Sequence, residues 1–246
     1  MVGHILSRRH LLSSAALIAA LYSSSASAAA ISGQLPWQPD TNAMPPQVKP
    51  GTWAYFTPDE AAAVEALADR LIPADELSPG GKDVGVAAYI DAQLAGDFGK
   101  DTGLYMQPPF ADGLPGQGFQ SALTPAARYR KSIAALNDYC RKAYLGKVFA
   151  DIPAADQDQI ISKMEAGTLS LGGPNSKAFF QLVWQNTKEG FFADPIYGGN
   201  RGMAGWKMIG FPGARYDYRD WVEKHNQPYP LPPVGMADHP DWKSHV

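Results

Sequence analysis

The sequence has one cysteine in 246 residues, and this scarcity excludes several kinds of site. A single thiol cannot form a disulfide within the chain, nor can it supply the thiolates that structural zinc, iron–sulfur clusters or covalently attached haem require. Cys140 falls on the apolar stripe of a predicted helix, four residues after Leu136 and three before Ala143. We therefore expect an inert buried thiol, and we expect any cofactor held through cysteine to sit on another protein.

Histidine is also scarce, and the common catalytic and nucleotide-binding motifs are missing. Three of the five histidines lie after residue 224, and none has the helical spacing of a zinc pair such as H-E-x-x-H. The glycine-rich stretch 198–205 fits neither G-x-G-x-x-G nor the P-loop pattern, and the chain has no G-x-S-x-G motif. We therefore expect no catalytic residue, no metal ligand and no cofactor-binding residue in this chain.

The N-terminus carries an apolar run that is too short for a stable membrane anchor. Arg8 and Arg9 precede the apolar run 11–21, and the small residues of 23–30 that follow suit a signal peptidase. The pattern predicts that residues 1–30 are a cleaved twin-arginine signal and that the protein is periplasmic; the alternative is an uncleaved N-terminal anchor. Removing two arginines and no acidic residue changes the formal net charge from −3 to −5, which does not favour nucleic acid or an anionic membrane surface.

Helical periodicity is abundant in the rest of the chain. Residues 31–55 lack it, and we expect an extended arm there. Apolar stripes at helical spacing predict five helices, at 58–72, 82–94, 125–143, 153–166 and 176–187. Thr57 and Thr124 each precede a proline, which is typical of a helix start, and the last helix is apolar on nearly all faces, which predicts a central position. We expect an all-α fold, with a single compact helical domain over 56–246, long irregular loops rich in glycine, proline and aromatic residues, and an extended C-terminal tail.

The segment Glu189–Trp221 is rich in glycine and aromatic residues and has no regular apolar period. Long irregular segments of this kind usually serve recognition, and tyrosine, tryptophan and arginine are enriched at protein–protein hot spots. We select ten residues for a partner interface: Asp194, Tyr197, Gly198, Gly199, Asn200, Arg201, Trp206, Lys207, Arg215 and Tyr216. The adjacent glycines would allow close backbone approach. The alternative is that the segment folds back over the helix at 179–184.

Four stretches of the sequence resemble one protein family. They are FTPDEAAAVEALADRLIPAD at 56–75, AFFQLVWQNT at 178–187, EGFFADPIYGGNR at 189–201 and GWKMIGFPG at 205–213. In these stretches the chain resembles the gluconate 2-dehydrogenase subunit 3 family, the small or gamma subunit of membrane-bound, flavin-dependent dehydrogenases. The likeness covers nearly all of the chain after the predicted signal.

The resemblance implies a periplasmic complex of three subunits. A large FAD-containing subunit of the glucose–methanol–choline (GMC) type oxidises D-gluconate to 2-dehydro-D-gluconate, and a membrane-associated multihaem cytochrome c passes the electrons to ubiquinone. FAD and haem c are thus expected on partner subunits. The small subunit has no active site of its own and supports the export, maturation and stability of the flavoprotein.

Three alternatives to this reading remain open at the level of sequence. The chain is the small subunit of a related sugar, polyol or ketogluconate dehydrogenase, a catalyst or FAD-binding module in its own right, or a free-standing periplasmic carbohydrate-binding module. Aromatic residues interleaved with arginines also suit stacking on sugars, which is the basis of the last alternative.

Overall fold

The structure, a computed structural model, describes residues 46–49, 51–103, 106–111, 113–114, 121–215 and 218–238. Internal contacts divide the chain into a unit of residues 1–40 and a unit of residues 41–246, and every described residue belongs to the second. The predicted signal with Arg8 and Arg9, and the predicted interface residue Tyr216, lie outside the described residues.

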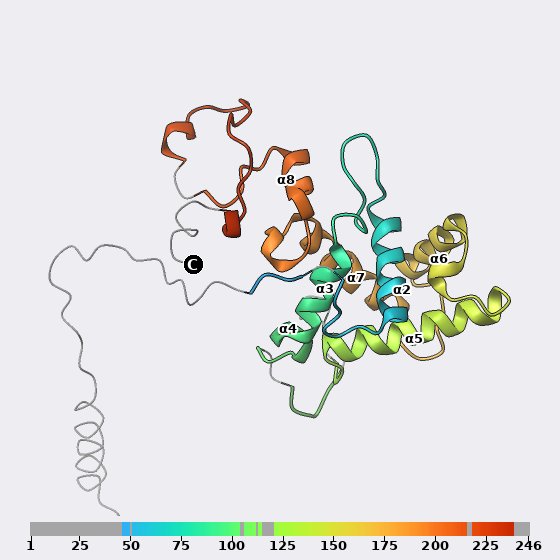
Figure 1. Ribbon diagram of the computed structural model, residues 1–246. Coiled ribbons are helices and arrows are strands. Elements are labelled where there is room, and N and C mark those ends of the chain that lie inside the picture. Colours follow the sequence, from blue (N-terminus) through green and yellow to red (C-terminus); the bar gives the residue numbers. More distant parts are fainter. Residues whose placement is uncertain are drawn as a thin grey trace, which may run out of the picture. The chain divides into compact units, whose positions relative to one another are not determined.

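The described part of the chain contains seven helices and no β-strand, which confirms the expected all-α fold (Figure 1). The helices are α2 (Pro58–Leu71), α3 (Val86–Ala95), α4 (Asp97–Lys100), α5 (Pro125–Ala143), α6 (Ala154–Ala166), α7 (Ser176–Phe192) and α8 (Ala204–Ile209). Five of them lie where the sequence predicts helices. The other two, α4 and α8, are too short to show an apolar period.

The predicted starts of α2, α5 and α7 are confirmed by their caps, whereas α3 begins at Val86, four residues after its predicted start. The Thr57 side chain accepts from the backbone N–H of Glu60, and the Glu60 carboxylate accepts in return from Thr57 N at 2.9 Å. Thr124 and Asn175 cap α5 and α7 in the same way, each through a side-chain oxygen. Such caps satisfy backbone donors that the first turn of a helix leaves unpaired.

The helix α7 is the centre of the domain, as its apolar sequence predicts. It contacts α2, α3, α5, α6 and α8, and the helices form one group around it in Figure 1. It continues to Phe192, beyond the predicted end at residue 187, and includes Gly190. The ring of Tyr89 lies against this glycine. A Cβ added at Gly190 would come within 2.9 Å of a ring carbon of Tyr89. Gly190 therefore serves close packing between α3 and α7.

The single cysteine lies in the core, as expected. Cys140 is fully buried on α5, in the same cluster as Tyr129 and Phe179. Burial raises the pKa of its thiol to about 11, so the thiol stays protonated at neutral pH.

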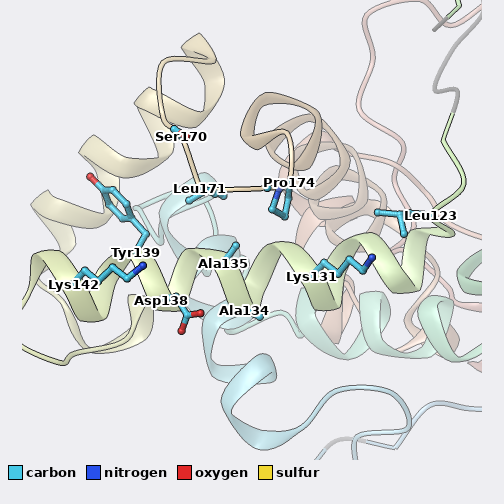
Figure 2. A pocket seen from close by; sticks show the side chains of 12 residues that line it. Leu123, Lys131, Ala134, Ala135, Asp138, Tyr139, Lys142, Ser170, Leu171 and Pro174 are labelled. Atoms are coloured by element: carbon cyan, nitrogen blue, oxygen red, sulfur yellow. The ribbon is translucent and has the colours of Figure 1, made fainter. Parts of the chain in front are cut away.

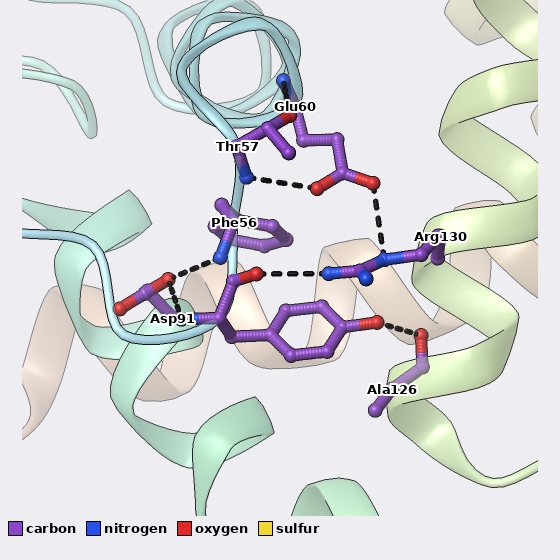
Figure 3. A network of polar contacts seen from close by, with 7 residues as sticks. Phe56, Thr57, Glu60, Asp91, Ala126 and Arg130 are labelled. Carbon is purple, nitrogen blue, oxygen red and sulfur yellow. Dashed lines mark hydrogen bonds and ion pairs between the residues drawn. The ribbon is translucent and has the colours of Figure 1, made fainter.

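The end of the predicted arm is fixed to the helices by a network of polar contacts (Figure 3). The buried carboxylate of Asp91 on α3 accepts three backbone N–H groups, from Ala54 at 2.7 Å, Tyr55 at 2.9 Å and Phe56 at 2.8 Å. Arg130 of α5 donates to Tyr55 O at 2.8 Å, and its guanidinium lies 4.4 Å from the centroid of the Tyr55 ring. Successive N–H groups around one carboxylate hold the chain in a single path onto α2.

The arm also reaches the Glu189–Trp221 segment. Val48 N donates to Ile196 O at 3.0 Å, and the Val48 side chain lies over Gly198, where an added Cβ would come within 2.7 Å of it. The described part of the arm therefore joins the irregular segment at one end to α2 and α3 at the other.

Candidate partner-binding surface

The Glu189–Trp221 segment starts as the last turn of α7 and then packs back against the end of that helix. A Cβ added at Gly199 would overlap the carbonyl oxygen of Gly190, and one added at Gly205 would overlap that of Phe191. Only glycine permits two backbones to come this close. At Gly199 the close approach is therefore made to this chain's own α7, and the approach of a partner at the adjacent glycines stays a prediction.

Asn200 holds this packing together. It is fully buried and has a left-handed backbone with φ of 46°, which asparagine tolerates better than most residues. Its side-chain Nδ2 donates to Ala193 O at 2.9 Å, and its Oδ1 accepts from Gly205 N at 2.8 Å. One side chain thus joins the end of α7 to the start of α8.

Trp206 of α8 faces inward as well. It is 5% exposed, and its Nε1 donates to Phe192 O at 2.7 Å. Its ring contacts the Phe211 ring edge-on, with 5.2 Å between the two ring centroids. We call the buried residues of this packing the inner layer: Gly198, Gly199, Asn200, Gly205 and Trp206. Their contacts in the structure are made within this chain.

Two other predicted interface residues hold the described part of the C-terminal tail. The carboxylate of Asp194 accepts from Ile196 N at 3.0 Å and from Met236 N at 2.8 Å. The guanidinium of Arg215 donates to Pro232 O at 2.7 Å and lies 5.5 Å from the centroid of the Tyr229 ring. The tail is therefore attached to the segment through these two side chains.

The other side of the same segment faces solvent and is apolar and basic. Three large apolar residues have a high exposed fraction: 39% for Met208, 58% for Ile209 and 44% for Phe211. Of the predicted interface residues, Lys207 is exposed next to Met208 in the chain, and Arg201 is also exposed, with its guanidinium beside Gly85 at the start of α3. We call these five residues the outer surface. Sequence reasoning selected its two cations and missed its three apolar members.

A pocket of about 550 Å³ opens where α3, the end of α7 and the following turn meet. Its lining residues are Tyr89, Gln93, Glu189, Phe192, Ala193, Asp194 and Tyr197, two of which, Asp194 and Tyr197, were predicted for the interface. Burial, together with the nearby carboxylate of Glu189, raises the pKa of Tyr89 to about 12. Phe192 connects this pocket to Trp206, which donates to its carbonyl.

A second, larger hollow of about 870 Å³ lies between α5 and residues 170–174 (Figure 2). On the α5 side it is lined by alternating small and long polar side chains, among them Lys131, Asp138, Tyr139 and Lys142. None of the nine predicted interface residues that the structure describes lines it. The described lining residues include no histidine or cysteine, which a nucleophile–base pair usually contains.

The described residues contain neither a metal-binding cluster nor a helix that could span a membrane. No cluster of three or more His, Cys, Asp or Glu side chains there is arranged to hold a metal ion. Within the same residues, no helix has both the length and the apolarity that crossing a membrane requires.

Comparison with known proteins identifies the family. The family model described as gluconate 2-dehydrogenase subunit 3 matches residues 58–213, well over half of the chain. The match includes every helix from α2 to α8, the inner layer and the outer surface. Comparisons with curated proteins and with solved structures gave no match. The chain belongs to the gluconate 2-dehydrogenase subunit 3 family.

Proposed function

We propose that this chain is the non-catalytic small subunit of a periplasmic, membrane-associated, FAD-dependent gluconate 2-dehydrogenase, and that its outer surface binds the flavoprotein subunit. Family membership supports a role in a complex with other dehydrogenase subunits. The observation that carries the choice of surface is the exposure of Met208, Ile209 and Phe211.

The outer surface has the composition of a binding site. Clustered exposed apolar side chains mark interaction surfaces, and full burial of one such side chain contributes about 1.5–3 kcal/mol. Lys207, next to Met208 in the chain, and Arg201 supply positive charge on the same segment, where it favours the orientation of a partner more than its affinity. The surface rests on Trp206, whose ring and hydrogen bond fix α8 to the end of α7. Because α8 is already fixed, few side chains and little backbone need to become ordered when a partner binds, and this lowers the entropic cost of binding.

The family resemblance supports the division of labour in the proposed complex. The GMC-type flavoprotein carries FAD and oxidises D-gluconate, and the multihaem cytochrome c carries the electrons to ubiquinone. This chain, with one buried cysteine, contributes a binding surface and stabilises the flavoprotein. It reaches the inner membrane through its partners.

The experiment is co-expression of the tagged chain with a candidate GMC-type flavoprotein subunit from the same organism, followed by purification from the periplasm. The proposal expects a complex with flavin absorbance and with gluconate oxidation towards a dye acceptor. Oxidation rates with 2-ketogluconate and with polyols identify the substrate among the related dehydrogenases. A chain that purifies without any flavoprotein, or that binds flavin and oxidises gluconate alone, contradicts the proposal.

Export is tested on the same strain through Arg8 and Arg9. Replacement of both by lysine blocks twin-arginine export in the proposed scheme, so this chain and the flavoprotein that it carries are expected to stay in the cytoplasm. Full recovery of the flavoprotein in the periplasm would show that it travels independently of this chain.

A further inference from the structure

The pocket beside the outer surface has an unbalanced charge. Its lining includes the carboxylates of Glu189 and Asp194, and none of the seven described residues that line it is a lysine, an arginine or a histidine. The nearest cation in the chain sequence, Lys188, lies with its ammonium group 5.1 Å from the centroid of the Trp184 ring. The pocket therefore favours a positively charged occupant.

The carboxylate of Glu189 is held in position by amide groups. Gln185 Nε2 donates to one of its oxygens at 2.8 Å, and Asn186 Nδ2 donates to the other at 3.0 Å. Asn186 is itself 3% exposed and accepts from the hydroxyl of the fully buried Tyr129 at 3.0 Å. A chain of hydrogen bonds thus runs from the core to this carboxylate and fixes its orientation before any partner binds.

The walls of the pocket are aromatic. Tyr89, Phe192 and Tyr197 are three of its seven described lining residues; the two tyrosines are partly buried and Phe192 is 38% exposed. The position of Tyr89 is set by its contact with Gly190 on α7. Aromatic faces attract cations, and a planar guanidinium both stacks on rings and donates two hydrogen bonds to one carboxylate.

We propose that this pocket receives an arginine side chain of the flavoprotein subunit, which donates to Glu189 and stacks on the aromatic walls. The inference rests on the proposed function and specifies its partner chemistry. Each Glu189 oxygen accepts one amide hydrogen and keeps further acceptor capacity for the guanidinium. Because Phe192 lines the pocket and also accepts from Trp206, the arginine site is continuous with the base of the outer surface.

The test is the affinity of the full chain for the flavoprotein subunit, measured for Glu189→Gln and for the matched control Glu165→Gln. Both glutamates are exposed, both changes remove one negative charge, and Glu165 lies on α6 and does not line the pocket. We expect Glu189→Gln to weaken binding by at least about tenfold and Glu165→Gln to change it by less than about twofold. Tyr197→Leu, which keeps bulk but removes the aromatic face, is expected to weaken binding by about threefold to tenfold. An unchanged thermal unfolding midpoint shows that each variant is folded.

A soluble probe gives a second readout. L-Argininamide is expected to compete with the flavoprotein for the wild-type chain and to have no effect beyond that of equal ionic strength on Glu189→Gln. Wild-type affinity in Glu189→Gln overturns the arginine site while leaving the proposed function in place. A wild-type chain that binds no flavoprotein overturns both. Binding of a neutral sugar in place of argininamide would assign the pocket to carbohydrate and overturn the inference.

Discussion

The inner layer and the outer surface belong to one segment, and they have different roles despite similar residue types. Trp206 and Phe211 are both aromatic and their rings touch, yet Trp206 is 5% exposed and Phe211 is 44% exposed. Asn200 and Lys207 are both polar, yet the first is fully buried and the second is exposed. Composition predicts that such a segment serves recognition, and only its packing separates the buried residues from the exposed ones.

The separation has a physical cause. The inner layer satisfies the backbone groups that the end of α7 and the start of α8 leave unpaired, through the side chains of Asn200 and Trp206. The three apolar side chains of the outer surface cannot form strong hydrogen bonds to the backbone, and a large part of their area stays exposed. We therefore expect substitutions in the inner layer to change the free energy of unfolding and substitutions in the outer surface to change binding.

The largest effect on stability is expected at Gly199. A Cβ there meets the backbone of Gly190, which cannot move without shifting α7, so Gly199→Ala should lower the free energy of unfolding by about 3 kcal/mol or more. Gly202→Ala is the matched control, because Gly202 has φ of +64° but nothing within 4 Å of an added Cβ. Gly202→Ala should lower the free energy of unfolding by about 1–2 kcal/mol, from backbone strain alone. Urea unfolding measures both, and equal losses would argue against close packing at Gly199.

A somewhat smaller loss is expected for Asn200→Ala. This change removes two buried hydrogen bonds and leaves Ala193 O and Gly205 N unpaired, which should cost about 2–3 kcal/mol. Asn200→Asp keeps the acceptor for Gly205 N, but it places a buried carboxylate oxygen against Ala193 O, so it should cost at least as much as the alanine variant. The same urea titration compares them, and an alanine variant as stable as the wild type would show that this asparagine is dispensable.

A smaller, pH-dependent effect is expected from Tyr89. Its pKa is raised by burial from about 10 in the unfolded chain to about 12 in the folded protein. The stabilisation is present in full below about pH 10, where both states are protonated, and is lost as the pH rises towards 12, because the unfolded state releases its proton first. Tyr89→Phe should flatten this part of the stability curve between pH 9 and about pH 12. An identical alkaline slope in both proteins would exclude Tyr89 as a contributor.

The smallest effect on stability is expected on the outer surface. Met208 and Ile209 are exposed, and glutamine is a good helix former, so the double change Met208→Gln and Ile209→Gln should alter the free energy of unfolding by less than about 0.5 kcal/mol. Thermal unfolding followed by circular dichroism checks this. A loss comparable to that of Asn200→Ala would mean that these side chains belong to the core.

Much of the helical architecture could be predicted from the sequence because it depends on local signals. Thr57 and Thr124 mark helix starts in the sequence and are caps in the structure, and the apolar stripe of α5 correctly predicts the burial of Cys140. The short α8 was not predictable from periodicity, since it ends after six residues at Gly210, whose φ is +68°. Its existence depends on Trp206 packing against α7, which is a contact between elements.

The candidate surface was predictable as a segment but not residue by residue. Gly199, Asn200 and Trp206 suit an interface by residue type, and the structure shows that they pack within the chain. The apolar pair Met208 and Ile209 resembles ordinary core sequence, and only the way α8 packs leaves it exposed. The role of either set in partner binding stays a prediction.

The most direct measurement of the central claim is the amount of flavoprotein that co-purifies with the Met208→Gln and Ile209→Gln double variant. Leu77→Gln is the control, because Leu77 is 74% exposed and lies outside the Glu189–Trp221 segment. We predict at least about a tenfold loss of flavoprotein with the double variant at an unchanged unfolding midpoint, and wild-type recovery with the control. Wild-type recovery with both variants would contradict the account, because it would exclude Met208 and Ile209 from the binding site.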